Sequence, residues 1–175
     1  SHPCQIMSDI LTFEEIKGDI KDKTITWLGD GDNNMSNSFI EASAKFGFKL
    51  NIGCPEKYKP NKNIIAWAKK NKANITVTKN PNEAVKNADC VMTDKWVSMN
   101  DKVDKKKKKQ ILKGYQVNKK IMKLAKSDAI FMHCLPVGRG EEATDEIVDG
   151  KQSVVWIQAL NRVHAQKGII NWCLN

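Results

Sequence analysis

The sequence predicts an α/β protein, a Rossmann-like three-layer domain in which helices flank a mostly parallel sheet of about five strands. Short apolar, β-branched runs have the length and composition of buried strands, at residues 24–28, 49–53, 75–78, 90–93 and 129–132. Helical segments alternate with these runs, and that alternation favours right-handed crossovers and a parallel sheet. With 175 residues, 41% of them hydrophobic, the chain suits one domain with its own core.

Local signals place the elements in chain order. Up to residue 78 the sequence predicts a helix capped by Ser8 and Asp9 and ended by Gly18, the strand 24–28, a helix within 33–44, the strand 49–53, a helix at 64–72 and the strand 75–78. Beyond it predicts a short helix at 81–86, the strand 90–93, a basic segment at 101–109, a helix at 117–125, the strand 129–132, a helical turn at 145–149, a last strand at 153–157 and a helix at 159–172. Pro81 suits a first helical position, where the missing N–H costs nothing.

Composition narrows the classes of partner and compartment. No apolar run approaches the roughly 18 residues of a membrane span, and no signal-peptide pattern opens the chain. The five cysteines are odd in number and scattered, which argues against disulfides or a zinc site. The net charge of +9 is spread along the chain, and no aromatic residue interleaves with the lysine run to stack bases. We therefore expect a cytoplasmic protein that binds neither nucleic acid nor membrane.

Two strands end in residues that can carry chemistry. Cys134 follows the strand 129–132, and Asp94 follows the strand 90–93. In an open parallel sheet, ligands bind in the crevice outside the carboxyl ends of the strands. Cys134 is therefore a candidate reactive group and Asp94 a candidate partner for a substrate ammonium group. The simpler alternatives are a small buried thiol beside a turn for Cys134 and a helix cap for Asp94.

The motif around Cys134 also carries a resemblance. His-Cys-Leu-Pro at residues 133–136, followed by Arg-Gly-Glu-Glu at 139–142 and Thr-Asp-Glu at 144–146, resembles the signature of the ornithine carbamoyltransferases, which make citrulline from ornithine and carbamoyl phosphate. Four further blocks agree in order: His-Pro-Cys-Gln at 2–5, Gly-Asp-Gly-Asp-Asn-Asn at 29–34, Asp-Lys-Trp-Val-Ser-Met at 94–99, and Asn-Arg at 161–162 with His-Ala-Gln-Lys at 164–167.

The resemblance implies an enzyme, a carbamoyltransferase, and a set of site residues. The residues it implies for ornithine are Asn34, Asp94, Ser98 and Met99. Those it implies for carbamoyl phosphate are His2, Gln5, Cys134, Leu135 and Arg162, with Cys134, Asp94 and Arg162 as the catalytic ones. Carbamoyl transfer calls for neither a metal nor an organic cofactor. Arg139 is left open between a contact beside the substrate and a surface role.

The chemistry of carbamoyl transfer gives these groups their roles. An alkyl amine with a pKa near about 10.4 is scarce in its reactive form at neutral pH, so a base must take its proton. Cys134 as a thiolate could accept or accommodate that proton. Fixed donors aimed at the carbonyl oxygen stabilise the tetrahedral intermediate, and His2, the Leu135 backbone and Arg162 are the candidates.

The resemblance also implies a domain organisation. Residues 1–19 are expected to be a linker segment and helix from a junction, 20–157 the ornithine-binding α/β domain, and 158–175 a C-terminal helix. The family's phosphate-gripping Ser-Thr-Arg-Thr-Arg loop does not occur here. We therefore expect the ornithine-binding half, inactive by itself, of an enzyme that is usually a homotrimer.

Departures from the family pattern leave alternatives open. Asn100 stands where the family has glycine, and Ile157 and Leu160 also depart from its pattern. A carbamoyltransferase for putrescine or an ornithine derivative is one alternative, although Asp94 and Ser98 favour an amino acid. A dinucleotide-binding domain is another, but Asn34 occupies the place of the fingerprint's third glycine. A basic nucleic-acid-binding module is the third.

Overall fold

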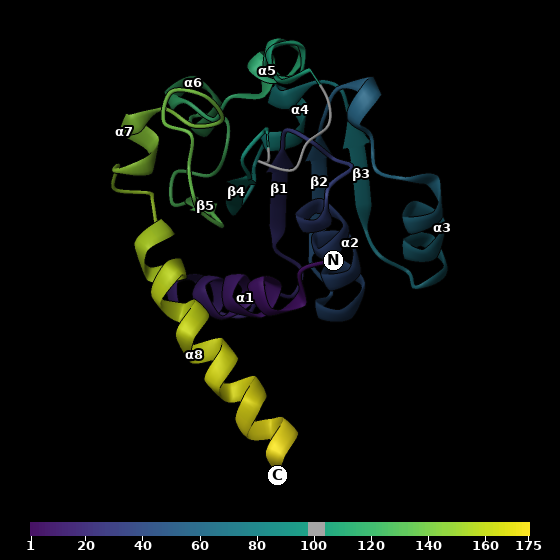
Figure 1. The fold of residues 1–175 in the computed structure, drawn as a ribbon, viewed down its shortest axis with the longest axis vertical. Helices are drawn as coiled ribbons and strands as arrows, with labels where there is room; N and C mark the ends of the chain where they lie inside the picture. Colours follow the sequence, from purple (N-terminus) through teal and green to yellow (C-terminus); the bar gives the residue numbers. More distant parts are fainter. Residues whose placement is uncertain (98–103) are drawn as a thin grey trace.

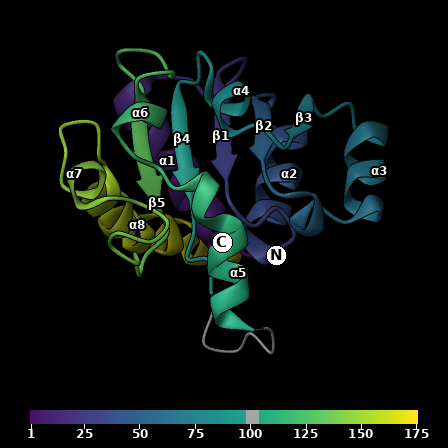
Figure 2. The same ribbon diagram turned by 90° about the horizontal axis from the view of Figure 1, so that it is seen from above.

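The protein forms a single open sheet between two layers of helices in the computed structural model, which describes residues 1–97 and 104–175 (Figure 1). Its strands are β1 (Thr24–Leu28), β2 (Lys49–Gly53), β3 (Ile75–Thr78), β4 (Cys90–Thr93) and β5 (Ile130–His133). All the pairings among them are parallel, in the order β3-β2-β1-β4-β5 (Figure 2). The predicted fold class, an α/β domain with a mostly parallel sheet of about five strands, is confirmed.

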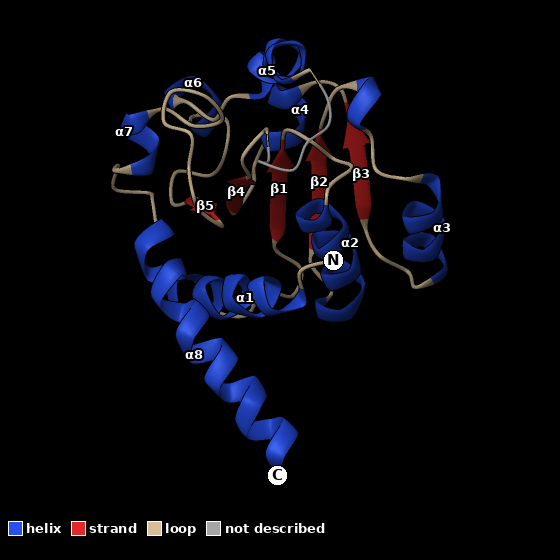
Figure 3. Cartoon of the chain, in the orientation of Figure 1, coloured by secondary structure: helices blue, strands red, loops and turns tan. Residues whose placement is uncertain are grey.

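Helices precede, connect and follow the strands (Figure 3). They are α1 (Pro3–Lys17), α2 (Asn34–Phe46), α3 (Lys62–Lys70), α4 (Pro81–Val85), α5 (Lys105–Leu112), α6 (Lys119–Met122), α7 (Asp145–Val148) and α8 (Val155–Leu174). Local chemistry begins several of them: the Asn33 side chain accepts the Ser36 N–H at the start of α2, and Pro81 opens α4.

The two faces of the sheet bury different layers because side chains alternate along each strand. Ile25 and Trp27 of β1 face a core shared with α1 and α2, whereas Leu28 faces a second core shared with α4, α6 and α7. The same alternation places Met132 in the first core and Phe131 in the second. Both faces are covered, which explains why the strands read as continuous apolar runs.

Two predictions about the elements are wrong. The first helix begins at Pro3, so Ser8 and Asp9 lie inside it, fully buried, where Ser8 Oγ donates to the Gln158 carbonyl oxygen. The stretch 153–157 is not a strand. It contributes one isolated bridge, between Phe131 and Ser153, after which α8 starts at Val155. A short apolar run does not by itself separate a strand from a buried helix start.

The last helix is longer than predicted and reaches beyond the body of the protein. Its first half packs along α1, while its second half projects outward to the C-terminus (Figure 1). A domain boundary at 157/158 falls inside this helix. Apolar side chains remain exposed along it, among them Leu160 and Trp172. Within residues 1–97 and 104–175, no helix is both long and apolar enough to cross a membrane.

Candidate functional site

The chain changes direction across the sheet at β1, and this creates a crevice at the boundary with β4. β2 and β3 follow β1 on one side, while β4 and β5 lie on the other. The register aligns Leu28 with Thr93 and Thr93 with His133, so the three strands end level. Asp94 directly follows β4, Cys134 directly follows β5, and the turn at Gly29 follows β1. Ligands collect at such a switch point in open α/β sheets.

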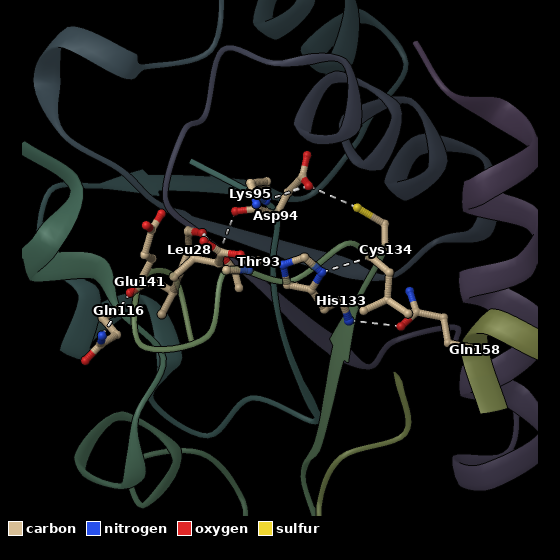
Figure 4. Close-up of polar contacts among 12 residues, drawn as sticks. Leu28, Thr93, Asp94, Lys95, Gln116, His133, Cys134, Glu141 and Gln158 are labelled. Atoms are coloured by element: carbon tan, nitrogen blue, oxygen red, sulfur yellow. Dashed lines mark hydrogen bonds and ion pairs between the residues drawn. The ribbon is translucent and has the colours of Figure 1, made fainter. Parts of the chain in front are cut away.

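Asp94 and Cys134 meet at this edge (Figure 4). The Cys134 Sγ lies 3.1 Å from Asp94 Oδ1, which also accepts the Lys95 N–H. Burial, followed by the neighbouring Asp94 carboxylate, raises the pKa of the Cys134 thiol. The expectation of a thiolate therefore differs from the structure: the group is a protonated thiol that donates to a carboxylate. Asp94 caps no described helix, since the cap of α5 is Asp104.

The start of α1 and the first turns of α8 supply a second cluster beside this pair. The Arg162 Nη1 donates to Gln5 Oε1. Arg162 lies in α8, which packs along α1, the helix that carries Gln5. A cavity of about 160 Å³ opens here, lined by Gln5, His133, Cys134, Leu135, Gln158, Ala159 and Arg162.

His2 adjoins the same cluster. Its backbone N–H donates to Ser38 Oγ at 2.6 Å, which ties the start of the chain to α2. Burial lowers the pKa of the His2 ring, the nearby Arg162 lowers it further, and Asp94 opposes them. The residues expected for carbamoyl phosphate, together with Asp94, thus come from four separate segments to one place.

The turn after β5 is fixed from within. Leu135 N donates to His133 Nδ1 at 2.9 Å, so the proton of a neutral His133 ring is on Nε2, which faces Glu142 Oε1 at 3.3 Å. His133 and Glu142 are both buried, and Glu142 also accepts the Gly138 N–H. The Leu135 N–H is therefore engaged within the turn. The sequence had suggested this N–H as a donor to a substrate carbonyl, but it is not free for that role.

The remaining expected residues lie farther out or outside the described ranges. Asn34 is the first residue of α2 and is exposed at the crevice end of β1. Ser98 and Met99, like Asn100, lie outside the described residues. Arg139 pairs on the surface with Asp145 and Asp149, which agrees with the surface alternative for this residue.

The glycine at the turn of residues 29–31 is explained by packing and not by dinucleotide binding. A Cβ on Gly31 would lie 2.8 Å from the Tyr58 carbonyl oxygen, which accepts the Gly31 N–H. The position therefore serves close packing of two loops. Between its glycines, Asp30 forms a buried ion pair with Lys108 of α5, with 2.7 Å between Oδ2 and Nζ.

Sequence reasoning missed the buried polar groups beneath the site. Asp9 accepts hydrogen bonds from Gln5 and Gln158, and Gln158 Oε1 accepts the His133 N–H at 2.9 Å. The one available signal was the position of Asp9, four residues after Gln5 on the apolar side of α1, where a carboxylate needs partners.

Known proteins resemble this chain in sequence over almost its whole length. The family model described as the Asp/Orn-binding domain of aspartate/ornithine carbamoyltransferase matches residues 21–173. A relative from Rhodopseudomonas palustris named ornithine carbamoyltransferase is 58% identical over 174 residues, which are 99% of this chain and 56% of the relative. One from Nitrobacter winogradskyi with the same name is 52% identical, again across 56% of its length.

Solved structures agree with these sequences. An ornithine carbamoyltransferase from Pyrococcus furiosus superposes with a TM-score of 0.90 at 42% identity, across 97% of this chain and 55% of that one. An anabolic ornithine carbamoyltransferase from Campylobacter jejuni gives a TM-score of 0.90 at 34% identity, across 98% of this chain and 58% of that one. The chain thus spans little more than half the length of the relatives it matches.

Proposed function

Because the chain belongs to the aspartate/ornithine carbamoyltransferase family, we propose that it is the ornithine-binding half of an ornithine carbamoyltransferase. The reaction is transfer of the carbamoyl group of carbamoyl phosphate to the δ-amine of L-ornithine, which gives L-citrulline and phosphate. The observation that carries this proposal is the contact between Cys134 Sγ and Asp94 Oδ1 at the carboxyl edge of the sheet. This contact brings the motif that begins at Asp94 and the motif that contains Cys134 together, beside Arg162.

The amine end of the reaction falls to Asp94 and Cys134. Asp94 offers a carboxylate to a substrate ammonium group, and Asn34 lies at the same edge of the sheet for the amino-acid end, with Ser98 and Met99 following Asp94 in the chain. Cys134 as a neutral thiol cannot remove a proton from the amine. It holds Asp94 by donating a hydrogen bond to the carboxylate.

The carbamoyl end falls to Arg162, Gln5 and His2. A guanidinium is a permanent, planar donor that suits both a phosphate oxygen and a carbonyl oxygen that gains charge. Burial and the nearby Arg162 lower the pKa of His2, which favours the neutral ring, and a neutral ring can donate one N–H to the same oxygen. Since the Leu135 N–H is engaged, its carbonyl oxygen is the backbone group left for the substrate.

A chimera tests this proposal. Residues 1–175 replace the matching part of the Rhodopseudomonas palustris relative, and citrulline formation is measured with ornithine and carbamoyl phosphate. We expect an active chimera, and no turnover from residues 1–175 alone, because positioning two substrates supplies much of the rate and the phosphate-gripping loop is absent from this stretch. Robust turnover by the 175 residues alone would overturn the half-site assignment.

Substitutions and a competing substrate sharpen the test. Arg162→Gln and Asp94→Asn in the chimera should each abolish most activity, whereas Arg139→Gln, on the surface, should not change it. A chimera that carbamoylates putrescine better than ornithine would show that the amine assignment is wrong. We further propose that the longer protein is a cytoplasmic homotrimer, which sedimentation of the active chimera would check.

A further inference from the structure

Asp9 is a fully buried carboxyl group directly beneath the proposed site. It lies on α1, one helical turn after Gln5, and only 2% of its surface is exposed. Its Oδ1 accepts two hydrogen bonds, from Gln5 Nε2 at 2.8 Å and from Gln158 Nε2 at 2.6 Å. Within the described part of the chain, its Oδ2 has no hydrogen-bond partner. A carboxyl group in such a place needs a reason, since burial without full pairing is costly.

The two side-chain amides that donate to Asp9, those of Gln5 and Gln158, also contact two different parts of the site. A side-chain amide has one oxygen and one NH₂ group, so fixing the NH₂ fixes the direction of the oxygen. With its NH₂ on Asp9, Gln5 turns its oxygen to the Arg162 guanidinium. With its NH₂ on Asp9, Gln158 turns its oxygen to the backbone N–H of His133. One carboxyl group thus orients both the arginine and the end of β5 that carries Cys134.

The groups around Asp9 make its ionisation sensitive to the site. Burial raises the pKa of Asp9 to about 7, against the hydrogen bonds from Gln5 and Gln158 and the charge of Arg162, while Asp94 raises it. Burial is the main cause that raises the pKa of the thiols of Cys90, at the start of β4, and Cys134, just after β5, and the charge of Asp9 adds to it in both. Hydrogen bonds to a carboxylate are roughly twice as strong as those to a neutral group. Loss of the Asp9 proton therefore strengthens the hydrogen bonds that Gln5 and Gln158 donate to it.

We propose that Asp9 is a positioning residue of this site, which sets the orientation of Gln5 and Gln158, and through them of Arg162 and the His133–Cys134 backbone, more firmly when its carboxyl is ionised than when it is protonated. The hydrogen-bond network stands on the geometry alone. Its consequence for catalysis rests on the proposed function.

Nuclear magnetic resonance on residues 1–175 tests the network without substrate. The side-chain NH₂ signals of Gln5 and Gln158 and the backbone amide signal of His133 should shift together between pH 5 and 9 with one common midpoint near 7. Asp9→Asn, which keeps the shape of the side chain, should remove this shift. The matched control is Asp32→Asn, another aspartate with a raised pKa but one that lines a different surface hollow. It should leave the shift unchanged.

A second variant guards against loss of folding in Asp9→Asn. Gln5→Leu keeps Asp9 but removes one of the hydrogen bonds that lower its pKa, so the midpoint seen at Gln158 and His133 should move to higher pH. The proposal is overturned if the three signals do not titrate together, or if they titrate alike with Asn at position 9.

The consequence for catalysis is measured in the chimera described above. We expect kcat to rise with pH through about 7, and Asp9→Asn to remove that rise while the KM for ornithine changes less than kcat. An inactive chimera with an intact titration at Asp9 would refute the proposed function alone. An active chimera whose pH profile is unaffected by Asp9→Asn would refute the positioning role alone.

Discussion

Replacing Lys108 by methionine should destabilise the protein far more than any other single lysine change in α5. The Lys108 Nζ is 2.7 Å from Asp30 Oδ2, and the exposed fractions of the two side chains are 9% and 8%. The same Nζ lies 5.4 Å from the centre of the Tyr58 ring. Methionine preserves most of the side-chain volume, so the main loss is the charge. A buried carboxylate deprived of its cation costs about 3–5 kcal/mol, a large share of the roughly 5–15 kcal/mol by which domains are stable.

Urea unfolding followed by tryptophan fluorescence measures this free energy. Lys106→Met is the matched control, because Lys106 is exposed on the same helix and its replacement should fall within about 0.5 kcal/mol of the parent. The double variant Lys108→Met/Asp30→Asn removes the stranded charge and should be more stable than Lys108→Met alone. Equal losses for the two lysines, or a double variant no better than the single one, would refute the importance of the pair.

Two further predictions concern titrating groups. The pKa of Asp9 is raised from 3.8 in the unfolded chain to about 7 in the folded protein, so the folded state holds the proton more tightly. The stability that the protonated carboxyl contributes is therefore fully present below pH 4 and is lost as the pH rises through 7. Thermal unfolding across that range should show this loss, and Asp9→Asn should remove it. Cys134 should alkylate faster than the fully buried Cys90. Asp94→Asn should speed the reaction of Cys134 further, because it removes a charge that, after burial, raises the pKa of the thiol. Peptide mapping after brief alkylation is the measurement, and no acceleration in Asp94→Asn would contradict the electrostatic explanation.

The sheet was predictable because its signals are local. Each strand is an apolar, β-branched run bounded by a turn, and the alternation of strand and helix then leaves few topologies. The convergence of Asp94 and Cys134 followed from the same logic, since both come directly after parallel strands. The first helix was misplaced because Ser8 and Asp9 resemble a cap, although each side chain forms a hydrogen bond with α8, almost the whole length of the chain away.

The polar groups beneath the site could not be predicted for the same reason. Nothing near Asp9 in the sequence shows that Gln158, 149 residues later, will donate to it. In α5, five consecutive lysines read as a solvated face, yet Lys108 is buried against Asp30. Which lysine turns inward depends on how α5 rests on the turn after β1. Tertiary packing decides that, and local propensity does not.

The position of β1 in the middle of the sheet has a consequence for how the chain folds. Parallel strands cannot pair through a hairpin, and β1 meets β4 only across 65 residues, the separation of Leu28 and Thr93. Pairings of such long range make folding slow. We therefore expect β1, β2 and β3 to associate first, which leaves one side of β1 as an open edge that invites aggregation. Pairing of β4 with β1 closes that edge, and because the proposed site lies where these two strands end, it is among the last parts of the protein to form.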